Sequence, residues 1–161
     1  MRAITYARFG PAAEVLVEED LETPTPAGGE VLVRLRASGV NPSDVKGRAG
    51  KRAGVPEMPY PKIVPHSDGA GIIEAVGDGV PAARVGERVW IWNGQWRRAF
   101  GTAAEYIAVP TDQAVPLPES VSFAVGATLG IPGFTACHAV LGGGDVAGRT
   151  VLVSGGAGTV G

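Results

Sequence analysis

The sequence predicts a mostly β domain that is followed by an α/β C-terminal part. The first 118 residues hold short apolar stretches separated by turns rich in proline and glycine, a pattern that favours a small β-barrel or sandwich. From Ser120 onward the apolar residues follow the spacing of helices. A short apolar run at 151–153 then leads into a glycine-rich turn, as at the start of a nucleotide-binding β/α unit. We therefore divide the chain into domains 1–118 and 119–161.

The composition is that of a globular protein, and its charge pattern is not that of a protein that binds nucleic acid or an anionic membrane. Of the 161 residues, 45% are hydrophobic, which suffices for the core of about one domain. The net charge is −2 and no basic run occurs, so neither nucleic acid nor a membrane is an expected partner. No signal peptide and no membrane-length apolar run is visible. The single cysteine, Cys137, excludes an internal disulfide and a cysteine-rich zinc site, and we expect a cytoplasmic protein.

Three strands are predicted in the first part of the chain, at 2–7, 14–18 and 30–37. In the third, apolar residues at odd positions alternate with Arg34 and Arg36, which predicts one buried and one solvent-facing side. The stretch 22–29 is a predicted loop, because its prolines cannot donate to a central ladder.

The segment 39–50 predicts a short helix with polar groups at its start. Asn41 is a favourable N-cap, Pro42 fits the first helical position, and Asp44 in the first turn suits the helix dipole. Such a capped helix accounts for these residues without any function. In the alternative interpretation, Asn41 and Asp44 project into a pocket.

The next segment, 51–65, has no regular period and is long enough to form a lid or pocket wall. Arg52 and Tyr60 are its side chains best suited to a site, although surface placement also explains each. His66 and Asp68 follow at a spacing that is not a metal-ligand signature. We expect His66 to be a hydrogen-bonded structural residue or part of a pocket rim.

Three more strands are expected before residue 118. Residues 70–76 form one, with Gly69, Gly71 and Gly77 marking bulges or close backbone approach. The others are 85–92, which ends at an Asn93-Gly94 turn, and 102–109. Between 110 and 118 we expect a loop with one short apolar piece at 114–115. The nearby Trp92 and Trp96 could wall a pocket, although such residues more often belong to the core.

The C-terminal part predicts two helices and then a strand. Ser120 is a candidate cap for the first helix, Pro132 interrupts the pattern, and 133–141 forms the second helix before the glycines at 142–144. After the predicted strand at 151–153, the glycines at 156, 158 and 161 have the spacing G-x-G-x-x-G. In a dinucleotide-binding unit these positions allow a tight turn, approach of a pyrophosphate and close helix packing.

Several short motifs occur along the chain in the same order as in one known family. They are Gly39-Val-Asn-Pro-Ser-Asp44, Arg48-Ala-Gly50, Asp68-Gly-Ala-Gly-Ile-Ile-Glu-Ala-Val-Gly77, Val85-Gly-Glu-Arg-Val89, Ala104-Glu-Tyr106, Pro116-Leu-Pro118, Gly133-Phe-Thr-Ala136 and 155–161. As a set they resemble the N-terminal half of the medium-chain dehydrogenase/reductase superfamily, in its zinc-independent quinone oxidoreductase (zeta-crystallin-like) branch. The resemblance implies a GroES-like, partly open β-barrel domain, followed by the start of a Rossmann domain that binds NADPH. It also implies a longer protein, a homodimer when intact.

The departures from zinc-dependent relatives imply that no metal is used. Those relatives carry a catalytic cysteine where this chain has Pro42, and a ligand histidine where it has Ser67. Quinone oxidoreductases often have a tyrosine at the place of Arg52, and the nearest tyrosine here is Tyr60. The proton in the reaction would come from Tyr60 or from water.

By the same resemblance, hydride passes from NADPH to a quinone or an α,β-unsaturated carbonyl. The catalytic residues implied are Asn41, Asp44 and Tyr60. The cofactor-binding residues implied are Asn41, Arg48, Thr135, Gly156, Gly158 and Gly161. An alternative from another class is a non-catalytic GroES-like fragment that binds a ligand or partner. A zinc alcohol dehydrogenase lacks its ligands here.

Overall fold

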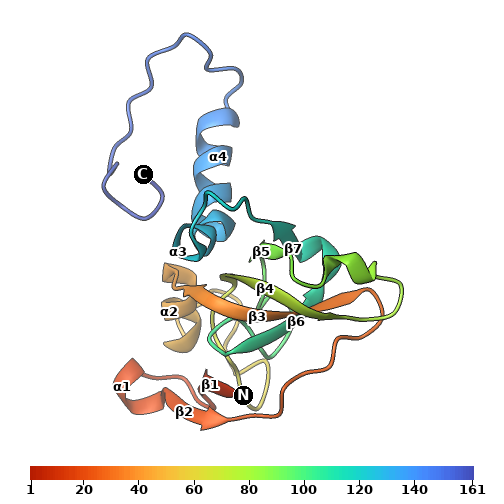
Figure 1. The fold of residues 1–161 in the computed structure, drawn as a ribbon. Coiled ribbons are helices and arrows are strands. Elements are labelled where there is room, and N and C mark those ends of the chain that lie inside the picture. Colours follow the sequence, from red (N-terminus) through yellow and green to blue (C-terminus); the bar gives the residue numbers. More distant parts are fainter.

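The computed structural model describes residues 1–161 and contains two antiparallel sheets. The larger sheet has five strands in the order β6-β3-β4-β5-β7 (Figure 1). These strands are β3 (Glu30–Gly39), β4 (Asp68–Val76), β5 (Arg88–Ile91), β6 (Tyr106–Pro110) and β7 (Ala114–Pro116). The smaller sheet pairs β1 (Arg2–Thr5) with β2 (Val17–Asp20). The predicted mostly β fold is therefore confirmed, with open sheets rather than a closed barrel.

The core of the larger sheet follows from the alternation of its strands. Val31 and Val33 on β3 are completely buried, whereas Arg34 and Arg36 are exposed, as the odd-even pattern predicts. The pattern departs at Leu32, which is also buried. The other members of this core cluster are Ile73, Val89, Ile91, Ile107, Val109 and Ala114. Each comes from one of the neighbouring strands or from β7, so the cluster holds the sheet together.

A bulge in β3 requires glycine on the facing strand. The β3–β4 register shifts between Leu35 and Ala37, and Gly71 pairs with Leu35. A Cβ atom on Gly71 would lie 2.1 Å from the carbonyl oxygen of Arg34. Only glycine allows the two backbones to come this close, so the prediction of close approach here is confirmed.

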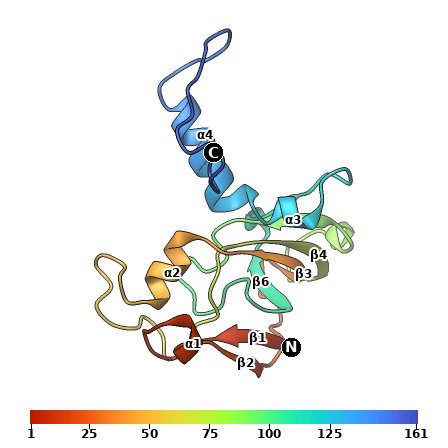
Figure 2. The same cartoon turned by 90° about the vertical axis from the view of Figure 1, so that its left-hand side faces the viewer.

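Short helices surround the sheets. They are α1 (Ala12–Val15), α2 (Pro42–Arg48), α3 (Phe123–Gly126), the π-helical turn η3 (Leu129–Gly133), α4 (Phe134–Leu141) and the 3₁₀ turns η1 (Ala82–Arg84) and η2 (Thr111–Gln113). In both ribbon views α4 projects away from the sheets and the C-terminal residues run back beside it (Figures 1 and 2). The longest helix, α4, has eight residues, so no helix is long and apolar enough to span a membrane.

Several predicted elements differ from the structure in their bounds, three of them for a visible reason or by several residues. The strand expected at 14–18 is wrong in its first half, because Pro11 starts a helical turn that buries Val15 against Tyr6. The cap of α3 is Ser122 rather than Ser120, since the Ser122 hydroxyl accepts the Val125 N–H at 3.2 Å. The strand expected from 102 begins only at Tyr106.

The strand expected at 151–153 does not form. Its three side chains are exposed, Leu152 to 94%, and the segment pairs with no other strand. A buried parallel strand gains its stability from neighbouring strands and from helices that cover both faces of the sheet. No neighbouring strand pairs with 151–153, so local propensity alone leaves this segment irregular.

Candidate functional site

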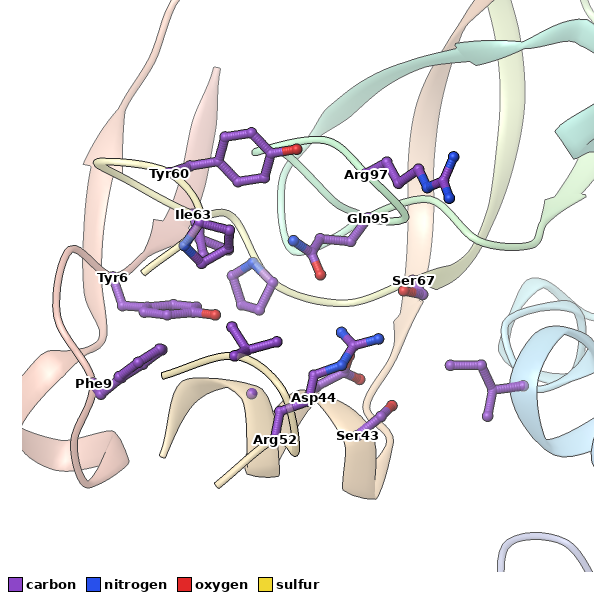
Figure 3. Close-up of a pocket in the computed structure, with 15 residues that line it drawn as sticks. Tyr6, Phe9, Ser43, Asp44, Arg52, Tyr60, Ile63, Ser67, Gln95 and Arg97 are labelled. Atoms are coloured by element: carbon purple, nitrogen blue, oxygen red, sulfur yellow. The ribbon is translucent and has the colours of Figure 1, made fainter. Parts of the chain in front are cut away.

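A cavity of about 360 Å³ lies between α2, the loop 51–65 and the turn that carries Gln95 (Figure 3). Aromatic rings line one end of it, from Tyr6, Phe9 and Tyr60. Its other lining residues are Ser43, Asp44, Gly47, Arg52, Val55, Pro59, Ile63, Pro65, Ser67, Gln95, Arg97 and Ile131. The cavity therefore joins an apolar aromatic end to a set of hydroxyl, amide and charged groups.

The first turn of α2 fixes Asp44 at the cavity. Asn41 adopts the extended conformation of an N-cap, and Pro42 follows at the first helical position. The Asn41 backbone N–H donates to Asp44 Oδ2 at 2.7 Å, and the Asp44 N–H donates to the Asn41 carbonyl at 3.0 Å. The predicted capped helix is thus confirmed, and Asp44 also lines the cavity. Of the two residues that the alternative interpretation places in a pocket, Asp44 lines the cavity and Asn41 does not.

Asn41 itself is buried below the cavity and contacts a second carboxyl group. Its Nδ2 donates to Asp68 Oδ2 at 2.7 Å, and the same oxygen accepts the Ile131 N–H at 2.9 Å. The other oxygen, Asp68 Oδ1, is buried and has no partner in the chain. It faces Gly130, where a Cβ atom would lie only 2.1 Å from it. Asp68 therefore connects the start of β4, the cap of α2 and the segment before α4.

Burial raises the pKa of both carboxyl groups. The pKa of Asp68 is raised by desolvation, which outweighs the hydrogen bonds from Asn41 and Ile131. The pKa of Asp44 is raised by desolvation as well, against the opposing hydrogen bonds from Asn41 and the charge of Arg52. The negative charge of Asp44 also contributes to the raised pKa of Asp68.

His66 belongs to a chain of hydrogen-bonded hydroxyls. Thr102 Oγ1 donates to the Asp68 carbonyl at 2.6 Å, and Ser38 Oγ lies 2.9 Å from Thr102 Oγ1 and 2.9 Å from His66 Nδ1. A hydroxyl has one proton, so Ser38 donates to Thr102 and accepts from His66, which places the imidazole proton on Nδ1. Burial lowers the pKa of His66, so the neutral ring is favoured.

The backbone of His66 is held in an unusual conformation. Its φ is 78°, in the left-handed region that side chains rarely adopt. The neighbouring residues Pro65 and Ser67 line the cavity, whereas His66 turns toward Ser38 on β3. The expectation of a hydrogen-bonded structural histidine describes this arrangement.

Two tyrosine hydroxyls reach the cavity without a hydrogen-bond partner in the chain, those of Tyr6 and Tyr60. In Figure 3 the Tyr60 hydroxyl is directed toward the turn that carries Gln95 and Arg97. Tyr6 is buried, and its pKa is raised by desolvation and then by the charge of Asp44. Tyr6 could not be identified from the sequence as a site residue, because a tyrosine within an apolar strand pattern is usually a core residue. Arg97 could not be identified either, since no local signal indicates which loop side chains face a distant helix.

Arg48 and Thr135 do not line the cavity. Arg48 Nη1 donates to the Gly10 carbonyl at 2.5 Å, and the Gly10 N–H donates to the Arg48 carbonyl at 3.0 Å. This pair of bonds fastens the end of α2 to the loop before α1. The Thr135 hydroxyl donates to the Ile131 carbonyl at 2.6 Å, within its own helical segment. Neither tryptophan considered above lines the cavity either, because Trp92 packs edge-on against Phe134 and Trp96 is half-exposed.

The glycine-rich C-terminal segment borders a second cavity, of about 690 Å³. Gly158 and Gly161 line it together with Pro42 and residues of α4, whereas Gly156 does not. Between 155 and 161, only the Gly158 N–H donates a hydrogen bond to the chain. The other backbone N–H groups of this segment form no hydrogen bond within the chain.

No group of three or more His, Cys, Asp or Glu side chains is placed so that it could hold a metal ion. His66 Nδ1 is bonded to Ser38, and Asp68 is bonded to Asn41 and Ile131.

Comparison with known proteins assigns the chain to a family. Residues 27–119 match the alcohol dehydrogenase GroES-like domain, which accounts for more than half of the chain. The chain belongs to this GroES-like domain family. The quinone oxidoreductase of Rattus norvegicus is 41% identical over 162 residues, which cover 100% of this chain and 47% of that protein. The GroES-like chain thus spans about half the length of the curated relatives it matches.

Solved structures agree with this assignment. A mycobacterial protein complexed with NADPH is 31% identical, with a TM-score of 0.73 over 88% of this chain and 41% of that one. The quinone oxidoreductase from Coxiella burnetii is 26% identical, with a TM-score of 0.75 over 87% of this chain and 44% of that one. These findings confirm the resemblance of the GroES-like chain to quinone oxidoreductases of the medium-chain dehydrogenase/reductase superfamily.

Proposed function

We propose that this chain is the substrate-binding part of an NADPH-dependent oxidoreductase that reduces a quinone or an α,β-unsaturated carbonyl without zinc. The observation that carries the proposal is the aromatic cavity beside the capped start of α2. Pro42, at that same helix start, lines the second cavity next to the glycine-rich segment. A substrate in the first cavity and a dinucleotide in the second would therefore meet near Asn41 and Pro42.

The two proposed domains share the first cavity. Residues 1–118, the GroES-like substrate and catalytic domain, supply all of its lining except Ile131. Ile131 comes from 119–161, the proposed start of the Rossmann domain, and its N–H is bonded to Asp68. This contact supports a site built between the two domains.

The size of the first cavity suits a small aromatic acceptor. Its volume of about 360 Å³ falls at the lower end of the roughly 300–1,000 Å³ common for small-molecule sites. The rings of Tyr6 and Phe9 offer flat apolar surface for a planar substrate. A quinone or a cyclic enone has this shape and carries oxygens that the tyrosine hydroxyls and Gln95 could reach.

The chemistry divides between cofactor and protein. NADPH, when bound, supplies a hydride and thus two electrons. Reduction of the acceptor also requires a proton, which Tyr60 or water would deliver to the oxygen or carbon that becomes basic. Asn41 and Asp44 would hold the helix start in place beside the reacting groups, and the aromatic walls would keep water from the substrate.

The proposal that no zinc is used rests on the residues at the positions of the zinc ligands. Pro42 offers no ligand atom at the place where zinc-dependent relatives carry a cysteine, and Ser67 replaces their histidine. We also propose that the intact protein is a cytoplasmic homodimer, which sedimentation and cell fractionation would test.

The test of the proposed function is a titration of the intact protein with NADPH, in which binding is monitored by tryptophan fluorescence. Saturable quenching, together with NADPH oxidation in the presence of quinones or enones, is the expected result. The absence of both binding and turnover would reject the enzyme and leave a non-catalytic GroES-like module that binds a ligand. Parallel titration with NADH decides whether the cofactor preference is for NADPH.

A further inference from the structure

We propose that the first cavity selects acceptors that carry a negatively charged substituent, such as a carboxylate or sulfonate on an aromatic quinone or enone. This inference rests on the proposed function, because it concerns the substrate of the same site. It goes beyond that function in assigning a charge to the substrate. The argument depends on two arginines, on the scarcity of acidic groups around them, and on the aromatic end of the cavity.

The two arginines approach the cavity from separate loops. Arg52 belongs to the loop 51–65, and Arg97 belongs to the turn after β5. Neither forms an ion pair, since the ion pairs of the chain involve only Arg2, Lys62 and Arg84 as cations. Neither side chain donates a hydrogen bond to the chain, and both residues are exposed, so their N–H groups are accessible to a ligand in the cavity.

Acidic groups around the cavity do not balance this charge. Asp44 is the only carboxyl group among the lining residues, against the two arginines. Its Oδ2 is already occupied by the Asn41 N–H. The charge of Arg52 acts on Asp44 and lowers its pKa, but burial dominates and the pKa remains raised. At least one positive charge, that of Arg97, therefore has no counterpart in the cavity.

The positive groups and the aromatic rings occupy different parts of the cavity. Figure 3 shows Tyr6 and Phe9 together at one end and Arg97 with Ser67 toward the other. Arg52 rises from the side of α2 between them. A ligand that is apolar at one end and anionic at the other would match both ends at once. Guanidinium groups suit carboxylates and sulfonates in particular, because their N–H fork binds two oxygens together.

The backbone conformation of Arg97 supports a functional role for this residue at the cavity. Its φ is 56°, in the left-handed region, and its guanidinium carbon lies 5.5 Å from the centre of the neighbouring Trp96 ring. Non-glycine residues in this region are uncommon and concentrate at functional sites. The turn thus places an arginine at the cavity at some conformational cost.

The test compares the binding of naphthoate with that of naphthamide, its neutral amide. The two ligands have nearly the same shape and neither is reduced, so their affinities are measured without turnover. We expect naphthoate to bind about tenfold more tightly, as for a charge-assisted contact replacing a neutral one. The preference should disappear in the double variant R52Q/R97Q and persist in R34Q, because Arg34 is exposed on β3 and does not line the cavity.

Turnover provides a second readout in the intact protein. Naphthoquinone sulfonate should show a lower KM than naphthoquinone in the unaltered protein and in R34Q, and R52Q/R97Q should remove that difference. Equal affinity for naphthoate and naphthamide in the unaltered protein would overturn the inference. So would a loss of NADPH affinity in R52Q/R97Q with the naphthoate preference retained, because the arginines would then serve the cofactor. Reduction of naphthoquinone without any charge preference would reject this inference and leave the proposed function standing.

Discussion

The side-chain amide of Asn41 donates to Asp68 Oδ2 across 2.7 Å, and both residues are buried. Asn41 caps α2, and Asp68 begins β4, so this bond joins the helix that lines the cavity to the central sheet. Asp68 Oδ2 also accepts a hydrogen bond from the Ile131 N–H, which links β4 to the turn directly before α4. The bond therefore has consequences for stability that can be measured separately from activity.

Asn41→Ala should lower the free energy of unfolding by about 1–3 kcal/mol, because it leaves a buried carboxyl group without one of its donors. Asp68→Ala should also destabilise the protein. The two effects should not add, and a double-mutant cycle should give a coupling of about 0.5–3 kcal/mol. Denaturant unfolding of the three variants measures this, and strict additivity would show that the hydrogen bond contributes nothing.

Asp68→Asn should have an effect on stability that depends on pH. The folded pKa of Asp68 lies above its unfolded value, so the protonated form is favoured in the native state. Its contribution to stability is therefore complete below the unfolded value of about 3.9 and is lost as the pH rises through the folded pKa. The uncharged asparagine should thus gain stability relative to aspartate as the pH rises. A constant difference from acid to neutral pH would contradict the prediction.

His66 should contribute to stability in the opposite direction. Its folded pKa is lowered, so its contribution is present above the unfolded value of about 6.5 and is lost as the pH falls through the folded pKa. His66→Gln keeps a polar side chain without the titration. The stability advantage of the histidine over this variant should shrink on acidification, as followed by thermal unfolding at several pH values. An advantage that grows on acidification would show that the charged ring is stabilised instead.

Gly71→Ala should be strongly destabilising, by about 3 kcal/mol or more, since the new methyl group would collide with the Arg34 carbonyl in the sheet. The matched control is Gly47→Ala on α2, where a Cβ atom meets nothing within 4 Å. That change should stabilise the helix by about 0.5–1 kcal/mol. Urea unfolding of both variants tests the pair, and similar effects of the same sign would contradict the argument.

Tyr60→Phe should reduce the turnover of the intact protein by about 100-fold if the hydroxyl delivers the proton. Its stability should change little, because the Tyr60 hydroxyl has no hydrogen-bond partner in the chain. Tyr106→Phe is a suitable control, since Tyr106 lies on β6 outside the first cavity. Unchanged turnover in Tyr60→Phe would assign the proton to water or to Tyr6.

Removal of metal should leave the activity of the intact protein unchanged. We expect full NADPH oxidation after dialysis against a chelator, because Pro42 and Ser67 replace the ligands of the zinc-dependent relatives. Elemental analysis of the dialysed protein completes the measurement. Loss of activity on dialysis, with recovery on adding zinc, would contradict zinc independence.

Local chemistry explains which parts of the fold could be predicted from the sequence. The alternation in β3 and the Asn-Pro start of α2 act over a few residues, so both were predicted correctly. Val15 was assigned to a strand because the burial that favours its helical turn comes from Tyr6 and Ile63, which no local pattern reveals. The strand at 151–153 failed for a related reason, since a buried strand depends on its neighbours more than on its own residues.

The same division holds for the candidate site. Asp44 and Tyr60 were identified in advance and both line the first cavity. Arg48 was assigned to the cofactor, but the structure shows its guanidinium bonded to Gly10. Tyr6 and Arg97 were not identified, because their place in the cavity depends on how distant loops meet. The position of Asp44 follows from the local capping pattern, whereas the positions of Tyr6, Arg48 and Arg97 depend on contacts with segments distant in the sequence.

The contact between Asp68 and Ile131 also determines where this protein could be divided. A chain shortened at residue 118 would lose the Ile131 donor and uncover the apolar cluster that Ala70 and Leu117 form with Ala127 of the α3 segment. The boundary suggested by composition would thus cut through one cooperative unit. In chimeras between relatives, the crossover should lie beyond Leu141, so that Ala127 and Ile131 are inherited together with the sheet they contact.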